Sequence, residues 1–290
     1  MIVINYSDED LEKLYIINFI SSCLSTLGSL LIFFMFIIHK KMRNLPYRLI
    51  FYLTIADIGS ALAFCLPMGD YWICQIQGGL LSYFMLSSIM WCAIISHAMS
   101  KVIKCNLDLH KYEKRYLFVG FVIPLLCLLV LVDNRSYSMT IGWCWIYERS
   151  PNSYEVYLQS FYKLITYYIP LLIIEVYILS QYFLIKRYFV TNSSILTSQE
   201  DLKRKVIGKM RLYPIVLFCC QMPCAIIRLI LFFYMPSWYY VSIAGFGLSI
   251  NGLANAVVYG ITQDVKSKIS KFFKKNKRSE LTTELDCSTN

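Results

Sequence analysis

The chain has 290 residues, of which 57% are hydrophobic and 16% are charged, and its formal net charge is +10. Soluble domains carry about 25% charged residues, so this composition excludes an ordinary soluble domain and favours a membrane protein with several spans. Long apolar runs separate the basic residues, which therefore indicate a membrane face and no nucleic-acid partner. No pair of Cys-x-x-Cys motifs is present, so we expect no metal site.

Seven apolar segments follow one another along the chain, each long enough to cross a hydrocarbon layer of about 30 Å as a helix. They cover residues 14–38, 49–68, 75–100, 116–132, 156–185, 206–235 and 238–261. The sequence therefore predicts an all-α integral membrane protein, a seven-transmembrane helix bundle over residues 14–262. We expect an extracellular N-terminus at 1–13, a short amphipathic cytoplasmic helix at 263–276 and a disordered cytoplasmic tail at 277–290.

The distribution of lysine and arginine orients this bundle. Of the 28 basic residues, 23 fall in alternate connections and in the C-terminal tail. Because basic residues gather on the cytoplasmic side, the N-terminus is expected outside and the C-terminus inside. Two glycosylation sequons, at Asn5 and Asn134, then fall on the outside.

Two cysteines are expected at the outer face. Cys74 begins the third apolar segment, and Cys144 lies in the longest outer loop. Disulfides persist on the oxidising side of a membrane, so these two residues are a plausible pair. The alternative is two unrelated thiols.

Ionisable residues inside a bilayer are costly, and each one is a candidate site. Arg228 lies in the outer half of the sixth segment and shares a helical face with Gln221. Its guanidinium could clamp a phosphate or carboxylate through two hydrogen bonds; the alternatives are a structural ion pair and a side chain that reaches the outer headgroups. Lys163, and Gln77 on the third segment, are further pocket candidates, while Glu175 could pair with Arg228 or be protonated.

A second polar set points to a conformational switch. Asp57 lies in the second segment, and the seventh carries Asn251, Asn255 and Tyr259 at successive helical turns. A buried acid that faces a ladder of amides can adopt two arrangements, and we add Trp91 of the third segment to this set. The alternative is a static polar contact between helices.

Several motifs occur in the order found in one known family. They are Arg48-Leu49-Ile50-Phe51-Tyr52-Leu53 with Ala56-Asp57, Gln77-Gly78, Gly142-Trp143-Cys144-Trp145-Ile146, Tyr213-Pro214 and Gly252-Leu253-Ala254-Asn255. Over residues 14–275 the chain resembles the slime-mould cyclic AMP receptors and their relatives. The resemblance implies a cell-surface receptor that acts on a heterotrimeric G protein. One departure is that residues 96–101 lack the Asp/Glu-Arg-Tyr triplet of rhodopsin-like receptors.

We therefore expect a plasma-membrane G-protein-coupled receptor, with no cofactor, that binds an extracellular small-molecule ligand such as cyclic AMP or another small anion. Its partners would be that ligand, a heterotrimeric G protein and the lipid bilayer; a homodimer stays open. An enzyme is not expected, because the three histidines lie apart near the inner face. The alternative is a seven-helix transporter or another membrane sensor that uses no G protein.

Overall fold

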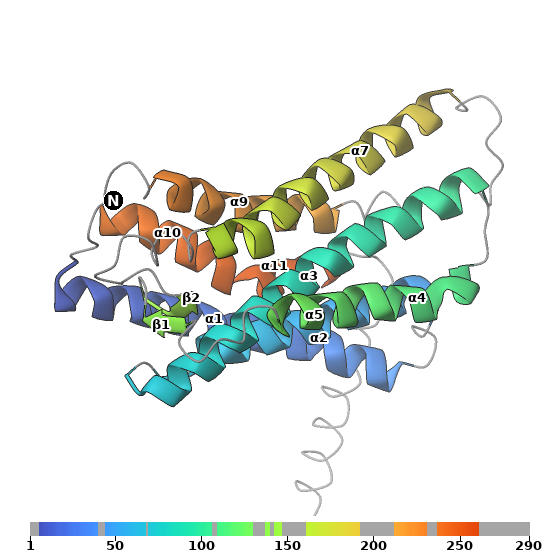
Figure 1. Cartoon of the computed structure of the whole chain (residues 1–290). Helices are drawn as coiled ribbons and strands as arrows, with labels where there is room; N and C mark the ends of the chain where they lie inside the picture. The colour runs from blue at the N-terminus through green and yellow to red at the C-terminus, as the bar shows by residue number, and fades with distance from the viewer. Residues whose placement is uncertain are drawn as a thin grey trace, which may run out of the picture.

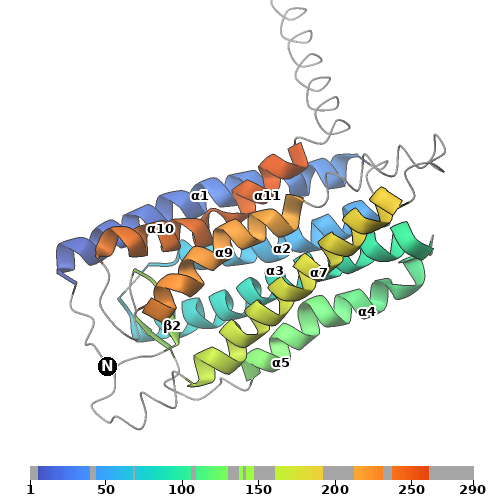
Figure 2. The same cartoon turned by 90° about the horizontal axis from the view of Figure 1, so that it is seen from above.

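The structure is a computed structural model. It describes residues 6–39, 44–67, 69–105, 109–129, 137–139, 142–146, 161–191, 212–230 and 237–260. Within these ranges seven helical stretches lie side by side as a bundle (Figures 1 and 2). An all-α membrane bundle is what the sequence predicted.

The first three stretches are single helices, and several of the others are divided. The elements are α1 (Asp8–Ile38), α2 (Leu45–Phe64), α3 (Tyr71–Cys105), η2 (Leu109–Tyr112), α4 (Glu113–Leu117), η3 (Phe118–Val122), α5 (Ile123–Leu129), η4 (Leu164–Tyr168), α7 (Ile169–Thr191), α9 (Leu212–Ile230), α10 (Trp238–Ser249) and α11 (Asn251–Gly260). Four helices are each long and apolar enough to cross a membrane, and the bent pair α10–α11 would be a fifth. The described part of α9 holds a shorter apolar helix, Ile215–Ile227.

Helix α1 turns apolar side chains outward and mainly small polar ones inward. In α1, Leu27 is 65% exposed, whereas Ser21 and Ser25 are 1% exposed. This is the reverse of a soluble helix, and it suits a lipid surround, where small interior residues allow helices to approach closely. α3 lies at the centre and packs against α2, α5, α7 and α9, while α1 packs against α2, α10 and α11.

Two prolines explain two wide helical turns. The π-helical turns η3 and η4 each end two residues before a proline, Pro124 and Pro170 respectively. Proline has no N–H and its ring clashes with the carbonyl four residues earlier, so the helix widens there. The carbonyl of Gly120, four residues before Pro124, instead accepts a hydrogen bond of 2.7 Å from Ser87. The fourth stretch is therefore an interrupted helix that is joined to α3.

A small hairpin stands at the end of the bundle where α1 begins (Figures 1 and 2). Its strands β1 (Tyr137–Met139) and β2 (Cys144–Ile146) pair antiparallel, with Tyr137 opposite Ile146. The sequence indicated a loop here and no strand. Both strands pack against α3, and all three residues of β2 are buried.

Several helix boundaries differ from those expected; α2 and α3, for example, each begin four residues earlier than predicted. α1 begins at Asp8, six residues earlier than predicted, because the Ser7 hydroxyl caps the helix by accepting from the Asp10 N–H at 3.2 Å. The fourth stretch runs from Glu113 to Leu129, slightly earlier than its apolar run. The predicted amphipathic helix at 263–276 and the tail lie outside the described residues.

Candidate functional site

Four side chains form a buried polar centre in the middle of the bundle: Asp57 of α2, Ser88 of α3, and Asn251 and Asn255 of α11. Ser88 and Asn251 donate to Oδ1 of Asp57 at 2.9 and 3.0 Å, and Asn255 donates to Oδ2 at 2.8 Å. Asp57 is 1% exposed, so the three donors replace the water that its carboxylate oxygens have lost. The structure thus brings together the acid and two of the amides that the sequence grouped.

A break in the seventh stretch presents the two asparagines to Asp57. α10 and α11 meet at an angle of 51°. Just before the break, the Ser249 hydroxyl donates to the carbonyls of Gly245 and Phe246 at 2.9 and 3.2 Å, a back-bonding pattern that bends helices. On the other side, Gly252 lies so close to Ser25 and Ser29 of α1 that a Cβ atom would not fit.

Trp91 lies in a different environment from the polar centre. It is fully buried, packs on Gly120, and has ring centroids 5.0 Å from Tyr52 and 5.2 Å from Phe121. Its indole N–H has no hydrogen-bond partner among the described residues. Trp91 therefore contributes to an aromatic contact between α2, α3 and the fourth stretch. The side chain of Tyr259 lies outside the described residues.

The outer end of α3 anchors the hairpin. Cys74 and Cys144 form a disulfide, with the two sulfurs 2.07 Å apart. Next to it, Oε1 of Gln77 accepts from the Cys144 N–H at 2.9 Å, while Nε2 donates to the carbonyls of Ala63 and Leu66 at 3.1 and 3.3 Å. Gln77 thus joins the end of α2, the start of α3 and the hairpin; its predicted contact with a ligand stays a prediction.

Beneath the hairpin, two further predicted pocket residues belong to one group, the tryptophan–lysine group: Trp145, Lys163, Tyr167 and Gln221. The Lys163 ammonium lies 5.5 Å from the centre of the Trp145 ring, and the Tyr167 ring meets the same indole edge-to-face at 5.2 Å. The Tyr167 hydroxyl donates to Oε1 of Gln221 at 2.8 Å. Lys163 and Gln221 are 3% and 2% exposed. The group therefore links β2, the fifth stretch and α9.

A pocket adjoins this group and shares Trp145 and Tyr167 with it. The pocket is small and open to the surface, with room for little more than one water molecule. The lining also includes Leu86 of α3, Pro124 of α5 and Thr166 of η4, and none of the lining residues is charged. The lining is largely apolar and Lys163 lies next to two of its residues, Trp145 and Tyr167, but a ligand group could enter only if these side chains moved apart.

Glu175 of α7 is the second buried carboxyl group of the bundle. It is 3% exposed, and neither carboxylate oxygen has a hydrogen-bond partner among the described residues. Its expected partner, Arg228, belongs to α9, but the Arg228 side chain lies outside the described residues, so their pairing stays a prediction. The two sequons, Asn5 and Asn134, also lie outside them.

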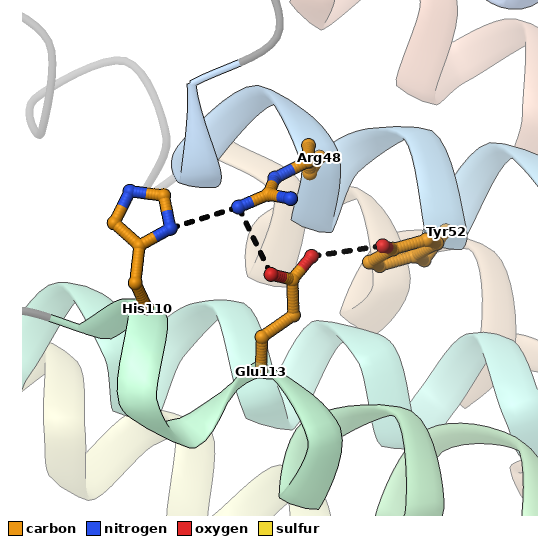
Figure 3. Close-up of polar contacts among 4 residues, drawn as sticks. All are labelled: Arg48, Tyr52, His110 and Glu113. Carbon is orange, nitrogen blue, oxygen red and sulfur yellow. Dashed lines mark hydrogen bonds and ion pairs between the residues drawn. The ribbon is translucent and has the colours of Figure 1, made fainter.

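At the opposite end of the bundle, four side chains form an inner cluster that the sequence did not single out: Arg48, Tyr52, His110 and Glu113 (Figure 3). Arg48 pairs with Glu113 at 2.9 Å and contacts Nδ1 of His110 at 2.8 Å. The Tyr52 hydroxyl donates to the other Glu113 oxygen at 2.9 Å. The cluster ties the start of α2 to η2 and α4, and the Tyr52 ring joins it to Trp91.

Several residues of these groups were not predicted as site residues, because the sequence gives only weak signals for their roles. Ser88 and Tyr167 are ordinary residues in apolar helices, and only their neighbours give them roles. Arg48 and Glu113 stand at the starts of two helices, where charge is common, so nothing in the pattern pairs them. Trp145 was part of a recognised motif, yet its position above Lys163 follows from the hairpin alone.

A seven-stretch bundle with a disulfide-anchored outer hairpin and a buried polar centre is the architecture of a G-protein-coupled-receptor-type membrane protein. The structure of squid rhodopsin has this fold: it aligns with a TM-score of 0.73 at 16% identity, over 94% of this chain and 87% of that one. A family model described as slime mold cyclic AMP receptor matches residues 5–266. The chain belongs to this family, which is a family of receptors and not of enzymes.

Similar proteins include two from Dictyostelium discoideum and one from Arabidopsis thaliana. Cyclic AMP receptor-like protein A of Dictyostelium discoideum is 27% identical over 276 residues, which are 93% of this chain and 70% of that protein. Cyclic AMP receptor-like protein G of the same organism is 30% identical over 173 residues, 54% of this chain and 30% of the relative. G-protein coupled receptor 1 of Arabidopsis thaliana is 24% identical, over 87% of this chain and 79% of the relative.

Proposed function

We propose that this multi-pass membrane protein is a plasma-membrane receptor that binds a small extracellular anion under the hairpin and activates a heterotrimeric G protein. The observation that supports it most directly is the buried ammonium of Lys163 beneath Trp145. A cation held at the outer end of a receptor bundle is suited to an anionic ligand.

The ligand class follows from the groups around this cation. A ring nitrogen or hydroxyl of a ligand can exchange hydrogen bonds with the Gln221 amide, and an apolar ring can lie against Trp145 and Tyr167. Arg228 is two helical turns beyond Gln221 on α9, and a guanidinium there could take a phosphate bidentately. Cyclic AMP combines one phosphate charge with an aromatic base, and the names of several relatives include it.

Signal transfer is proposed to use the polar centre and the inner cluster. Ligand binding between the hairpin, the fifth stretch and α9 favours one arrangement of these helices over another. The polar centre can exchange hydrogen-bond partners as α11 moves against α2 and α3. The inner cluster then changes the position of the connection between α3 and α4, which carries basic residues for contact with a G protein.

The test is binding of labelled cyclic AMP to membranes that contain the full chain, with and without excess unlabelled competitor. We expect saturable, displaceable binding that Lys163→Met weakens at least about tenfold, corresponding to a lost charge-assisted contact. The matched control is Lys13→Met, because Lys13 also lies over a tryptophan, Trp238, at 5.6 Å but is 44% exposed. The control should bind normally.

Two results would contradict this proposal in different ways. Saturable binding that survives Lys163→Met unchanged would place the ligand elsewhere. Absence of binding in well-expressed wild-type protein would exclude cyclic AMP, and other small anions would then be tested by G-protein nucleotide exchange. Ligand uptake without nucleotide exchange would favour the transporter alternative.

A further inference from the structure

Two free thiols meet between the first two helices. The sulfur of Cys23, in α1, lies 3.9 Å from the sulfur of Cys65, the residue that caps the C-terminal end of α2. The residues are 42 positions apart in the chain, so the contact arises from helix packing. Both are half-buried and neither belongs to the proposed ligand pocket or to the polar centre.

We propose that Cys23 and Cys65 form a second, redox-dependent disulfide that ties α1 to the outer end of α2. A disulfide bond is about 2.05 Å long, so the sulfurs must approach by roughly 1.9 Å, a movement that side-chain rotation about χ1 can supply. This proposal does not depend on the identity of the ligand.

The location favours oxidation. α2 runs toward the end of the bundle that holds the Cys74–Cys144 disulfide, and Gln77 bonds both to the carbonyls of Ala63 and Leu66 and to the Cys144 N–H. Cys65 therefore stands close to a disulfide that already requires an oxidising surrounding. Cys92, Cys220 and Cys224 are by contrast buried within the bundle.

The chemistry is thiol–disulfide exchange with an external disulfide. One protein thiol loses its proton to water, and its sulfur attacks the external disulfide, which releases one external thiol and leaves a mixed disulfide. The sulfur of the second cysteine then loses its proton and displaces the other external sulfur as a thiol. Two protein thiols and one external disulfide thus become one protein disulfide and two external thiols.

The bond would add a covalent connection to a helix whose buried face is made mainly of small polar side chains. The buried face of α1 consists mainly of one asparagine and four serines, Asn18, Ser21, Ser22, Ser25 and Ser29. This face packs against α2 and, through Ser25 and Ser29, approaches Gly252 of α11. Oxidation would therefore hold α1 against α2 beside the polar centre and limit how far α11 can shift.

To test this, membranes that contain the full wild-type chain are treated with oxidised glutathione, and the remaining free thiols are blocked with N-ethylmaleimide. The protein is then digested with a protease and the peptides are analysed by mass spectrometry. We expect a peptide pair cross-linked through Cys23 and Cys65, and equal protection of both from alkylation. Cys219, which is exposed, and Cys127, which is half-buried, should remain alkylated. Mild reduction should restore the two thiols.

A stability measurement adds an independent readout. Oxidation should raise the Tm of the wild-type protein on the order of 5 °C, and it should leave the Tm of Cys65→Ser unchanged while still raising that of the control Cys127→Ser. The proposal is overturned if Cys23 and Cys65 are alkylated as fully as Cys219 after oxidation. A glutathione adduct on one of them without the cross-link would overturn it too.

Discussion

The two buried carboxyl groups of the bundle occupy opposite kinds of surrounding. Asp57 accepts three hydrogen bonds from Ser88, Asn251 and Asn255, whereas neither oxygen of Glu175 has a partner among the described residues. Both are almost fully buried. A buried carboxylate that accepts hydrogen bonds from several helices stabilises the packing of those helices. A buried carboxylate that accepts none destabilises the arrangement that buries it. The hydrogen bonds of Asp57 thus stabilise the observed arrangement of α2, α3 and α11, from which a switch would have to start, whereas burial of Glu175 favours a change between α7 and α9.

The largest loss of stability is expected from replacing Asp57, whose carboxylate accepts three hydrogen bonds. Asp57→Ala leaves the Asn251 and Asn255 amides and the Ser88 hydroxyl without their acceptor, and should lower the free energy of unfolding by about 3 kcal/mol or more. Thermal unfolding in membranes and surface expression measure the loss. The control is Asp70→Ala, because Asp70 is exposed. Wild-type stability in Asp57→Ala would contradict the fixing role of the polar centre.

The next effect concerns the Tyr167–Gln221 hydrogen bond. Gln221→Leu removes the acceptor of a buried hydroxyl and should reduce affinity for the ligand about tenfold, with a loss of roughly 1–3 kcal/mol in stability. Tyr167→Phe removes the same bond from the other side. If the bond carries the effect, the double variant should bind hardly less tightly than either single variant. Fully additive losses would show that the two residues act separately.

Replacement of Glu175 is expected to change the free energy of unfolding less than replacement of Asp57, and in the stabilising direction. Glu175→Leu replaces a buried carboxyl that has no hydrogen-bond partner among the described residues by an apolar group, and should leave stability unchanged or raise it by about 1 kcal/mol. Ligand-induced nucleotide exchange should fall, because α7 loses its candidate partner for Arg228. The measurement is the Tm together with exchange. If Glu175→Leu destabilises the protein as much as Asp57→Ala does, both carboxyl groups stabilise the bundle to the same extent. The contrast drawn between their surroundings would then be wrong.

The smallest effect is expected in the inner cluster. Glu113→Gln weakens the ion pair with Arg48, whose side chain is 29% exposed, and pairs at such sites contribute about 0.5–1 kcal/mol. Since that energy holds the α3–α4 connection to α2, its loss should raise basal G-protein exchange about two- to fivefold. Glu9→Gln is the control, because it weakens an exposed ion pair, Glu9 with Lys13, at the start of α1 and away from the inner cluster. Basal exchange equal to wild type would exclude this role for the cluster.

Much of this comparison could not be predicted from the sequence. The pattern placed Asp57 and the two asparagines in one set, because polar residues at successive turns must face other helices. It could not separate them from Trp91, which instead packs on Gly120 with Tyr52 and Phe121. The sequence also could not show that the Gln77 side chain bonds three backbone groups, the carbonyls of Ala63 and Leu66 and the N–H of Cys144. These groups lie within its reach only because the end of α2 packs beside the hairpin.

The sequence by itself determined the class of membrane protein, the approximate positions of its helices and its expected orientation. These depend on the length of apolar runs and on the placement of lysine and arginine, which are local properties of the chain. Tertiary structure alone decided that Asp57 has three hydrogen-bond donors while Glu175 has no partner among the described residues, that Lys163 lies beneath Trp145, and that Cys23 meets Cys65. Such contacts depend on how each helix is rotated and on which helices are neighbours, and residues as far apart as Asp57 and Asn255 meet only after the bundle has packed.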